Sequence, residues 1–460
     1  MRASLIALAL LTPLPALAQE HGGHASPAPE AEAPPVDHGG MDHGATPPHT
    51  IDGGTTDHST VGHGSMDHGA MKQDGTMAGG GMVPRVTPGT GTSLLPGAEG
   101  GMRGVHLTHG GDWMVMAHGD VMLAYTDQGG PRGDDAVYSG SMAMLMAQRD
   151  YASGARLRFT GMWSLDPING QRGYPNLFAT GETAHGAPLV DRQHPHDFWM
   201  ELSARADVPL GGGVTGFLYG GPVAEPALGP SAFVHRRSAR YLPLSPISHH
   251  WFDSTHVTFG VVTAGLAARG VQLEASAFKG REPDEERWGF DTPKLDSWSV
   301  RASFTPSPNW AFQVSYGRLE QPEAMHAGED ERRTTASAHY AKGGFSAMAA
   351  FSAKDRVPGQ VLTAWLGEAN WNLDRHHSLF GRVENVGNDE LFPDHDDPLH
   401  DTKFRVTRFE GGYAYRIPLG RAELALGGSL AAYAKPAALD AAYGDRPLSY
   451  TLFARFAVGQ

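Results

Sequence analysis

The sequence predicts an all-β protein: an antiparallel transmembrane β-barrel of about 14–16 strands that follows a disordered tail rich in His and Met. Three observations lead to this prediction. The chain begins with an export signal, its part after residue 104 alternates between apolar and polar residues in short runs, and turns of Gly, Pro, Asp and Asn separate these runs. After residue 19, no stretch approaches the ~18–20 apolar residues that a membrane-spanning helix requires.

Residues 1–18 have the pattern of a secretory signal peptide. Arg2 precedes the mostly apolar stretch from Leu5 to Leu14, and Ala16-Leu17-Ala18 follows as a small-residue cleavage pattern. We therefore expect an exported protein, and because the chain has no Cys we expect no lipoprotein anchor.

The composition limits the available chemistry. Among 460 residues, 36 Lys and Arg against 50 Asp and Glu give a net charge of −14, which argues against nucleic acid as a partner. The absence of Cys excludes disulfides, Cys-ligated zinc, iron–sulfur clusters and cysteine nucleophiles. With 24 His and 17 Met, a metal site would be built from imidazole, thioether and carboxylate groups.

Residues 19–104 form the predicted tail, which has too few apolar side chains to build a core. The run His38-Gly39-Gly40-Met41-Asp42-His43-Gly44-Ala45 returns as His63-Gly64-Ser65-Met66-Asp67-His68-Gly69-Ala70, and Met71 follows. Imidazole and thioether groups suit copper, and thioethers favour Cu(I). The candidate metal ligands of the tail are His38, Met41, His43, His63, Met66, His68 and Met71. Two alternatives stay open: zinc or nickel as the ion, and a solvated linker that binds nothing.

The barrel prediction covers residues 105–460. Its clearest element is a hairpin in which residues 297–304 and 310–317 alternate strictly between apolar and polar side chains around the turn 305–309. With this hairpin, sixteen strands are predicted, and the other fourteen cover residues 113–125, 136–147, 155–164, 197–209, 213–221, 255–267, 270–280, 334–341, 344–353, 360–371, 377–386, 403–416, 420–433 and 448–457.

A soluble sandwich or propeller is the competing all-β fold. Against it, the polar faces of the predicted strands carry charged residues that suit a wet lumen better than a packed core: Arg156, Arg158, Glu201, Arg205, Glu274, Arg301, Arg382, Glu384, Arg405 and Arg455. We expect such an exported chain in a bacterial outer membrane, surrounded by lipid and with its tail in the periplasm.

The first two predicted strands carry further candidate metal ligands. Alternation places two sets of residues each on one strand face: Met114, Met116, His118, Asp120 and Met122 in the first strand, and Met142, Met144 and Met146 in the second. If both faces line the lumen, the strands form a ladder of soft ligands with neighbours ~5 Å apart. The alternative is that the three Met residues of the second strand face lipid or fill gaps.

Two predicted loops concentrate His and Asp. The candidate ligands, which would form one site if the loops meet, are His194, His196, Asp197, His249, His250, Asp253 and His256. The alternatives are that these residues brace the loops by hydrogen bonds, or that they serve a metal-dependent enzyme, although they match no hydrolase signature.

The chain resembles the copper-resistance protein B group of outer-membrane proteins. The resemblance is carried by Met41-Asp42-His43-Gly44 and Met66-Asp67-His68-Gly69 and by the order of tail and barrel. It implies binding of copper, as Cu(I) or Cu(II), and copper tolerance at the outer membrane, without a transport direction.

We therefore predict a non-enzymatic outer-membrane protein that contributes to copper tolerance by sequestering copper ions or letting them pass. Zinc and silver stay open as other ions, and the expected partners are outer-membrane lipid, metal ions and periplasmic copper proteins. Two other functions stay open: a general porin or small-solute channel whose tail is a tether, and an outer-membrane metal-dependent enzyme.

Overall fold

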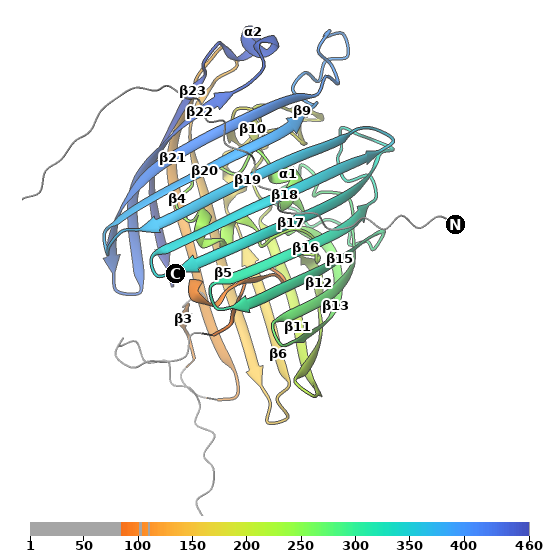
Figure 1. The fold of residues 1–460 in the computed structure, drawn as a ribbon, viewed down its shortest axis with the longest axis vertical. Helices are drawn as coiled ribbons and strands as arrows, with labels where there is room; N and C mark the ends of the chain where they lie inside the picture. Colours follow the sequence, from red (N-terminus) through yellow and green to blue (C-terminus); the bar gives the residue numbers. More distant parts are fainter. Residues whose placement is uncertain (1–83, 101–103, 109–110, 460) are drawn as a thin grey trace, which may run out of the picture. The chain divides into compact units, whose positions relative to one another are not determined.

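The computed structural model describes residues 84–100, 104–108 and 111–459. Sixteen long antiparallel strands form a closed barrel (Figure 1). The barrel strands are β4 (Met114–Gln128), β5 (Asp135–Asp150), β6 (Arg156–Trp163), β11 (Trp199–Gly211), β12 (Val214–Ala224), β13 (Thr258–Ala268), β14 (Val271–Phe278), β15 (Ser297–Ser307), β16 (Trp310–Leu319), β17 (Asp330–Lys342), β18 (Phe345–Val357), β19 (Val361–Asn372), β20 (His377–Asn388), β21 (Phe404–Leu419), β22 (Ala422–Ala434) and β23 (Leu448–Val458). The last strand, β23, pairs with the first, β4, and so closes the barrel.

Short elements lie outside this series of strands. They are β1 (Val86–Pro88), β2 (Leu94–Pro96), η1 (Gly97–Glu99), β3 (Val105–His106), η2 (Asp166–Asn169), β7 (Tyr174–Pro175), β8 (Glu182–Ala184), β9 (Ala187–Leu189), β10 (Arg192–Gln193), η3 (Phe233–His235), η4 (Arg237–Ala239), α1 (His249–Phe252), η5 (Ser254–His256), η6 (Ala437–Leu439) and α2 (Asp440–Tyr443). In the described part of the chain, no helix has the length and apolar character needed to cross a membrane.

The predicted alternation is present in the strands. In β15, Trp298 and Val300 are exposed on the outer face, whereas Ser299 and Arg301 are buried on the inner face. Around the barrel, exposed Leu, Val, Phe and Trp side chains cover the outer face. An apolar belt of this extent belongs in lipid and not in water, so the fold is a transmembrane β-barrel.

The two ends of the barrel have connections of different length. At one end, which we call the short-turn end, turns such as residues 308–309 and 343–344 join the strands. At the other, the long-loop end, the connections include residues 164–198, 225–257 and 279–296. Strand β4 begins at the short-turn end and β23 finishes there.

Aromatic side chains gather on the barrel at the short-turn end. Trp310 at the start of β16 pairs in register with Tyr340, and Phe345 at the start of β18 pairs with Trp371. The ring centroids of Trp310 and Tyr340 are 4.7 Å apart, and those of Tyr340 and Phe345 are 6.3 Å apart. Aromatic girdles of this kind lie at membrane–water interfaces.

Residues 225–257, which we call the lumen segment, fold into the barrel between β12 and β13 and are mostly buried. They form hydrogen bonds to strands around the wall, through the pairs Ala227–Ser276, Gly229–Ser315, Arg236–Glu368, Ser248–Glu384, Tyr241–Glu423 and Pro243–Tyr138. Because these partners lie on β14, β16, β19, β20, β22 and β5, the segment lies across the lumen.

The structure corrects one boundary and confirms the strands. All sixteen predicted strands are present. The predicted disordered tail extended to residue 104, but residues 84–100 form β1, β2 and η1 instead. Thr90 and Thr92 are buried there, and the Thr92 hydroxyl accepts a hydrogen bond of 2.9 Å from Arg301. A segment with few apolar residues is ordered here because its polar groups find partners in the lumen.

Candidate functional site

Two groups of potential metal ligands lie in the lumen. The first, which we call the Met/His wall, lies on β4 and β5 toward the short-turn end, and the second is a cluster of imidazoles and carboxylates among the connections of the long-loop end. The predicted signal peptide and the predicted tail ligands His38, Met41, His43, His63, Met66, His68 and Met71 lie outside the described residues.

The Met/His wall is built by facing residues of two strands. The register pairs Met116 with Met146, His118 with Met144, and Asp120 with Met142. The side chains of Met142 and Met146 are buried, whereas Leu145 between Met144 and Met146 is 40% exposed on the outer face. The Met side chains of β5 therefore point into the barrel and not toward lipid.

The wall continues onto two strands from which the sequence analysis selected no Met. Met162 of β6 pairs in register with Met144, and Met200 of β11 is buried in the same cluster. Side chains two positions apart share a strand face, so Met162 lies on the same face as the charged Arg158, and this signal could have placed it inside the barrel.

The two remaining Met candidates of β4 lie in different surroundings. Met114 pairs in register with Gln148 and Met122 with Gly140, so neither faces another Met across the strand pair. Met122 packs instead against an apolar cluster that includes Tyr138.

His118 of the wall lies beside His235 of the lumen segment. Their ring centroids are 5.9 Å apart, and all four ring nitrogens are buried without a hydrogen-bond partner among the described residues. Burial lowers the pKa of His235 to about 3, so its imidazole is neutral and has a free lone pair. A polar cavity of about 290 Å³ lies against His235 and Met142.

The two His-rich loops predicted from the sequence meet in the second group. The ring centroid of His194 lies 6.0 Å from that of His249 and 5.9 Å from that of His250. The rings of His196 and His256 are 5.2 Å apart, and His249 lies 5.3 Å from both His250 and His256. Five imidazoles from two loops therefore form one cluster.

Each of these five imidazoles has an oxygen atom beside its Nδ1. The oxygen partners are Glu182 for His194 (3.3 Å), Asp166 for His196 (2.8 Å), Asp253 Oδ1 for His249 (2.9 Å), Glu282 for His250 (3.1 Å) and the Asp253 carbonyl for His256 (2.6 Å). An Nδ1–H that donates to such an oxygen holds the ring in one orientation and leaves the lone pair on Nε2, whereas an Nδ1 without a proton can bind one metal ion together with the neighbouring carboxylate. Metal-binding imidazoles commonly have the first arrangement.

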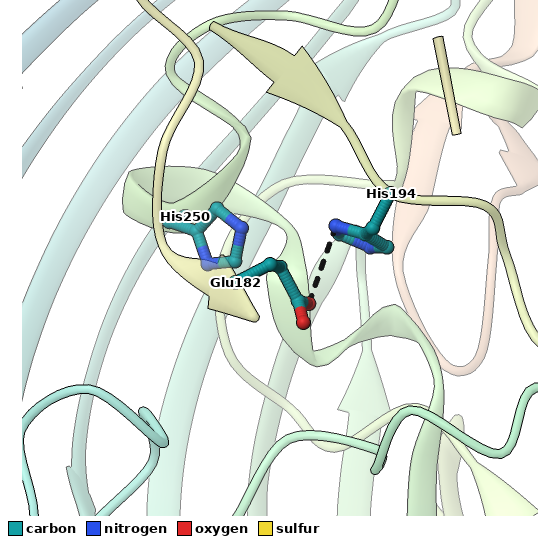
Figure 2. A group of neighbouring side chains, drawn as sticks. All are labelled: Glu182, His194 and His250. Carbon is teal, nitrogen blue, oxygen red and sulfur yellow. Dashed lines mark ion pairs between the residues drawn. The ribbon is translucent and has the colours of Figure 1, made fainter. Parts of the chain in front are cut away.

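The cluster also contains carboxylates that the sequence analysis did not select. Glu182 begins β8, His194 follows β10 and His250 lies in α1, and Figure 2 shows the three side chains pointing toward one another. One ligand atom from each lies within 4.8 Å of the other two, and the same holds for His250, Glu282 and Glu323. Glu282 and Glu323 belong to other connections than the His motifs, and Glu182 lies in the same connection as His194 but outside its motif, so the fold reveals that they meet.

The two candidate Asp residues are engaged by arginines. Asp197 lies 3.1 Å from Arg287, and Asp253 lies 2.9 Å from Arg236. Burial alone would raise the pKa of Asp253, but His249 and Arg236 hold it well below its ordinary value. These carboxylates support the cluster as partners of arginine and histidine.

Burial and charge set different protonation states for neighbouring imidazoles. Burial, together with Arg287 and His250, holds the pKa of His194 well below its ordinary value. Burial would also lower the pKa of His250, but Glu282 and Glu182 raise it to about 9. At neutral pH, a neutral His194 therefore lies beside a protonated His250.

A glycine makes room for His250. A Cβ atom at Gly181 would lie 2.6 Å from Cγ of the His250 ring, and the residue has φ +108°. Both the ring contact and the backbone conformation favour glycine at this position.

The closed barrel, its apolar outer belt and its charged interior define a transmembrane β-barrel protein with an occupied lumen. No family model and no curated protein matches the chain. Among solved structures, it is similar to OmpF of Salmonella typhi in complex with daunomycin, with 7% identity, a TM-score of 0.49, and coverage of 75% of this chain and 98% of that chain. The anion-selective porin from Comamonas acidovorans is 12% identical, with a TM-score of 0.49 and coverage of 75% of this chain and 99% of that chain. OmpT of Vibrio cholerae is 10% identical, with a TM-score of 0.46 and coverage of 76% of this chain and 99% of that chain. These similarities concern the barrel architecture and do not bear on function.

Proposed function

We propose that this protein is an outer-membrane channel of narrow bore for small solutes, which is the small-solute alternative considered from the sequence. The observation that carries the proposal is the lumen segment, residues 225–257, which lies across the barrel and is hydrogen-bonded to strands around its wall. The apolar belt and the aromatic girdle support a place in the outer membrane. Since short turns face the periplasm in barrels of this kind, we propose that the tail also lies there.

A buried ionic network holds the lumen segment in place. Arg236 contacts Glu368 of β19 at 2.7 Å and Asp253 at 2.9 Å, and all three side chains are buried. Arg382 of β20 contacts the same Glu368 at 3.3 Å, and Ser238 donates to it at 2.7 Å. If the segment left the lumen, these pairs would break and the charges on the wall would stay buried without compensation. The network therefore keeps the segment in the lumen.

Planar-bilayer conductance and liposome swelling test this proposal. The wild-type protein should conduct small ions and exclude sugars, and Glu368→Gln should raise the conductance because it loosens the lumen segment. Free passage of sugars through the wild-type barrel would contradict a narrow bore. An absence of conductance in both proteins would contradict a channel.

Copper handling is the second candidate function, and the Met/His wall favours it. Thioethers and neutral imidazoles on the lumen surface suit a soft ion such as Cu(I), with Ag(I) as its analogue. In this proposal the periplasmic tail collects ions at modest sites, and its several sites raise their local concentration. Periplasmic copper proteins would then exchange ions with the tail.

Equilibrium dialysis tests the part of the tail in copper binding. Deleting residues 21–82 should lower the number of copper ions bound per chain without disturbing the barrel. An unchanged stoichiometry would contradict a role of the tail in copper binding.

A further inference from the structure

We propose that Glu182, His194, His250 and Glu282 form a binding site for one first-row divalent metal ion, of which Zn²⁺ is the test case. The site lies within the barrel, where three connections of the long-loop end meet: residues 164–198, 225–257 and 279–296. The inference does not depend on passage of solutes, because a bound ion would cross-link these connections whether or not the barrel conducts.

The positions of the ligand atoms support the site. Nδ1 of His194 lies 3.3 Å from Oε1 of Glu182, and Nδ1 of His250 lies 3.1 Å from Oε1 of Glu282. His250 joins the two pairs, since it belongs both to the trio with Glu182 and His194 and to the trio with Glu282 and Glu323. With metal–ligand distances of ~2.0–2.2 Å, neighbouring ligand atoms of a tetrahedral site lie ~3.3–3.5 Å apart. Small side-chain rotations, together with release of the proton on His250, would therefore bring Glu282 and the first trio around one ion.

The charge balance of the surrounding residues also favours a cation. Among the described residues, the ion pairs around Glu182, Glu282 and Glu323, apart from those of Asp166 and Asp253, contain seven buried carboxylates and four buried cations: Glu182, Asp197, Glu282, Glu323, Glu331, Asp389 and Glu390, against Arg287, Arg333, Lys354 and Arg356. Arginine and lysine are therefore three fewer than the carboxylates, and in the metal-free protein the protonated His250 and the imidazole of His326 beside Glu390 offset part of this difference. Buried charges are normally paired or bound to metal, and a divalent ion would supply two of the missing positive charges.

The ligand types select the class of ion. Two imidazoles with two carboxylates suit Zn²⁺, Mn²⁺, Fe²⁺ or Co²⁺, whereas Mg²⁺ and Ca²⁺ prefer oxygen ligands only. None of the four proposed ligands is a thioether, which separates this site from the Met/His wall and from Cu(I).

The residues around the proposed ligands hold them in place. Arg287 contacts Oε2 of Glu182 at 2.9 Å and so leaves Oε1 beside His194. Gly181 provides the space in which the ring of His250 lies. These contacts keep ligands from separate connections together before an ion arrives.

Metal binding to the full chain in detergent tests the site. The chelator-treated protein is titrated with Zn²⁺ in competition with a chromophoric chelator, and folding of each variant is checked by heat-modifiable gel mobility. His194→Gln, His250→Gln and Glu182→Gln should each lose one tight equivalent or weaken it at least tenfold. His339→Gln is the matched control, since His339 is a buried imidazole on the inner face of β17 outside the cluster. Binding sites in the tail contribute equally to all variants and cancel in the comparison.

Equal tight binding by the wild type and the folded ligand variants would overturn the proposal. A second measurement uses the wild-type protein alone, so the test does not depend on variants that fold. Crystals soaked in Zn²⁺ should give an anomalous difference peak among the four side chains. If that peak is absent when enough Zn²⁺ is present to saturate the sites of the tail, the proposal is also overturned.

Discussion

Nε of Arg236 lies 2.7 Å from Oε1 of Glu368, and both side chains are fully buried. The contact joins the lumen segment to β19 of the barrel wall. The interior of this barrel is therefore connected to its wall by buried charges as well as by apolar packing.

Replacing Glu368 by Gln should destabilise the barrel by roughly 3–5 kcal/mol, because Arg236 and Arg382 would lose their shared carboxylate while staying buried. Urea unfolding in lipid vesicles measures the change. Glu286→Gln is the control, since Glu286 is exposed and its replacement should change the free energy of unfolding by less than ~0.5 kcal/mol. Equal effects of the two substitutions would show that the buried network does not stabilise the barrel.

Gly181→Ala should destabilise the protein more than Gly186→Ala does. Both glycines have positive φ and share the cost of a strained backbone, but only a Cβ at Gly181 meets the His250 ring, at 2.6 Å, whereas nothing lies within 4 Å of one at Gly186. The added clash should cost about 1–3 kcal/mol beyond the shared strain. Thermal unfolding of the two variants measures this difference, and identical melting temperatures would contradict the close contact.

The metal-free protein should lose stability as the pH rises from about 6.5 through about 9. The pKa of His250 is raised to about 9 from its ordinary value of 6.5, so the folded state holds a proton that the unfolded state releases. The contribution is fully present below pH 6.5 and disappears as the pH passes 9. Urea unfolding in the presence of a chelator should show this slope for the wild type and a flatter profile for His250→Gln. A wild-type profile without a slope in this window would contradict the ion pair with Glu282.

Replacing Met142, Met144 and Met146 together by Leu should reduce Ag(I) and Cu(I) binding in the barrel and leave the fold intact. Leu has a similar volume and no sulfur, so each replacement should cost less than ~1.5 kcal/mol. Met348→Leu is the control, because Met348 is a buried Met of β18 that packs in another cluster. Isothermal titration measures the binding, and unchanged binding by the triple variant would rule out the Met/His wall as a soft-metal site.

Leu430→Arg should lower the free energy of unfolding by about 2–4 kcal/mol. Leu430 is 72% exposed on the apolar belt and lies away from both ends of β22. Leu419→Arg at the short-turn end of β21 should cost at most ~1 kcal/mol, since an Arg there can reach the membrane surface. Unfolding from lipid vesicles compares the two variants. A smaller cost at Leu430 than at Leu419 would contradict the proposed depth of the belt.

Local pattern was sufficient to predict the strands and to group the Met residues of each strand on one face, but not to decide whether the Met face of β5 meets the lumen or lipid. A period of two residues assigns each side chain to one face of a strand, so Trp298 could be placed outside without knowledge of the rest of the fold. The side of Met144 stayed open, because Ala143 and Leu145 on the opposite face are also apolar. The separation of two His-rich loops in sequence did not hide their relation either, since His194 and His250 already stood out by composition.

The sequence could not reveal which connections fold into the barrel. Glu182 and Glu282 are ordinary acidic residues in loops until the fold brings them to His194 and His250, and His235 meets His118 only through the lumen segment. Composition was also misleading for Thr92, which is buried and accepts a hydrogen bond from Arg301. Long-range polar pairing of this kind has no local signature.

The pairing of β23 with β4 also affects how the barrel can assemble. The hydroxyls of Thr126 and Thr451 meet at 2.9 Å across this seam, although 325 positions separate them along the chain. Contacts between such distant positions form slowly, and until β23 arrives, β4 exposes an unpaired edge. Assembly must therefore protect that edge until the last strand has left the secretion machinery, so a truncation within β23 should trap an open, aggregation-prone sheet.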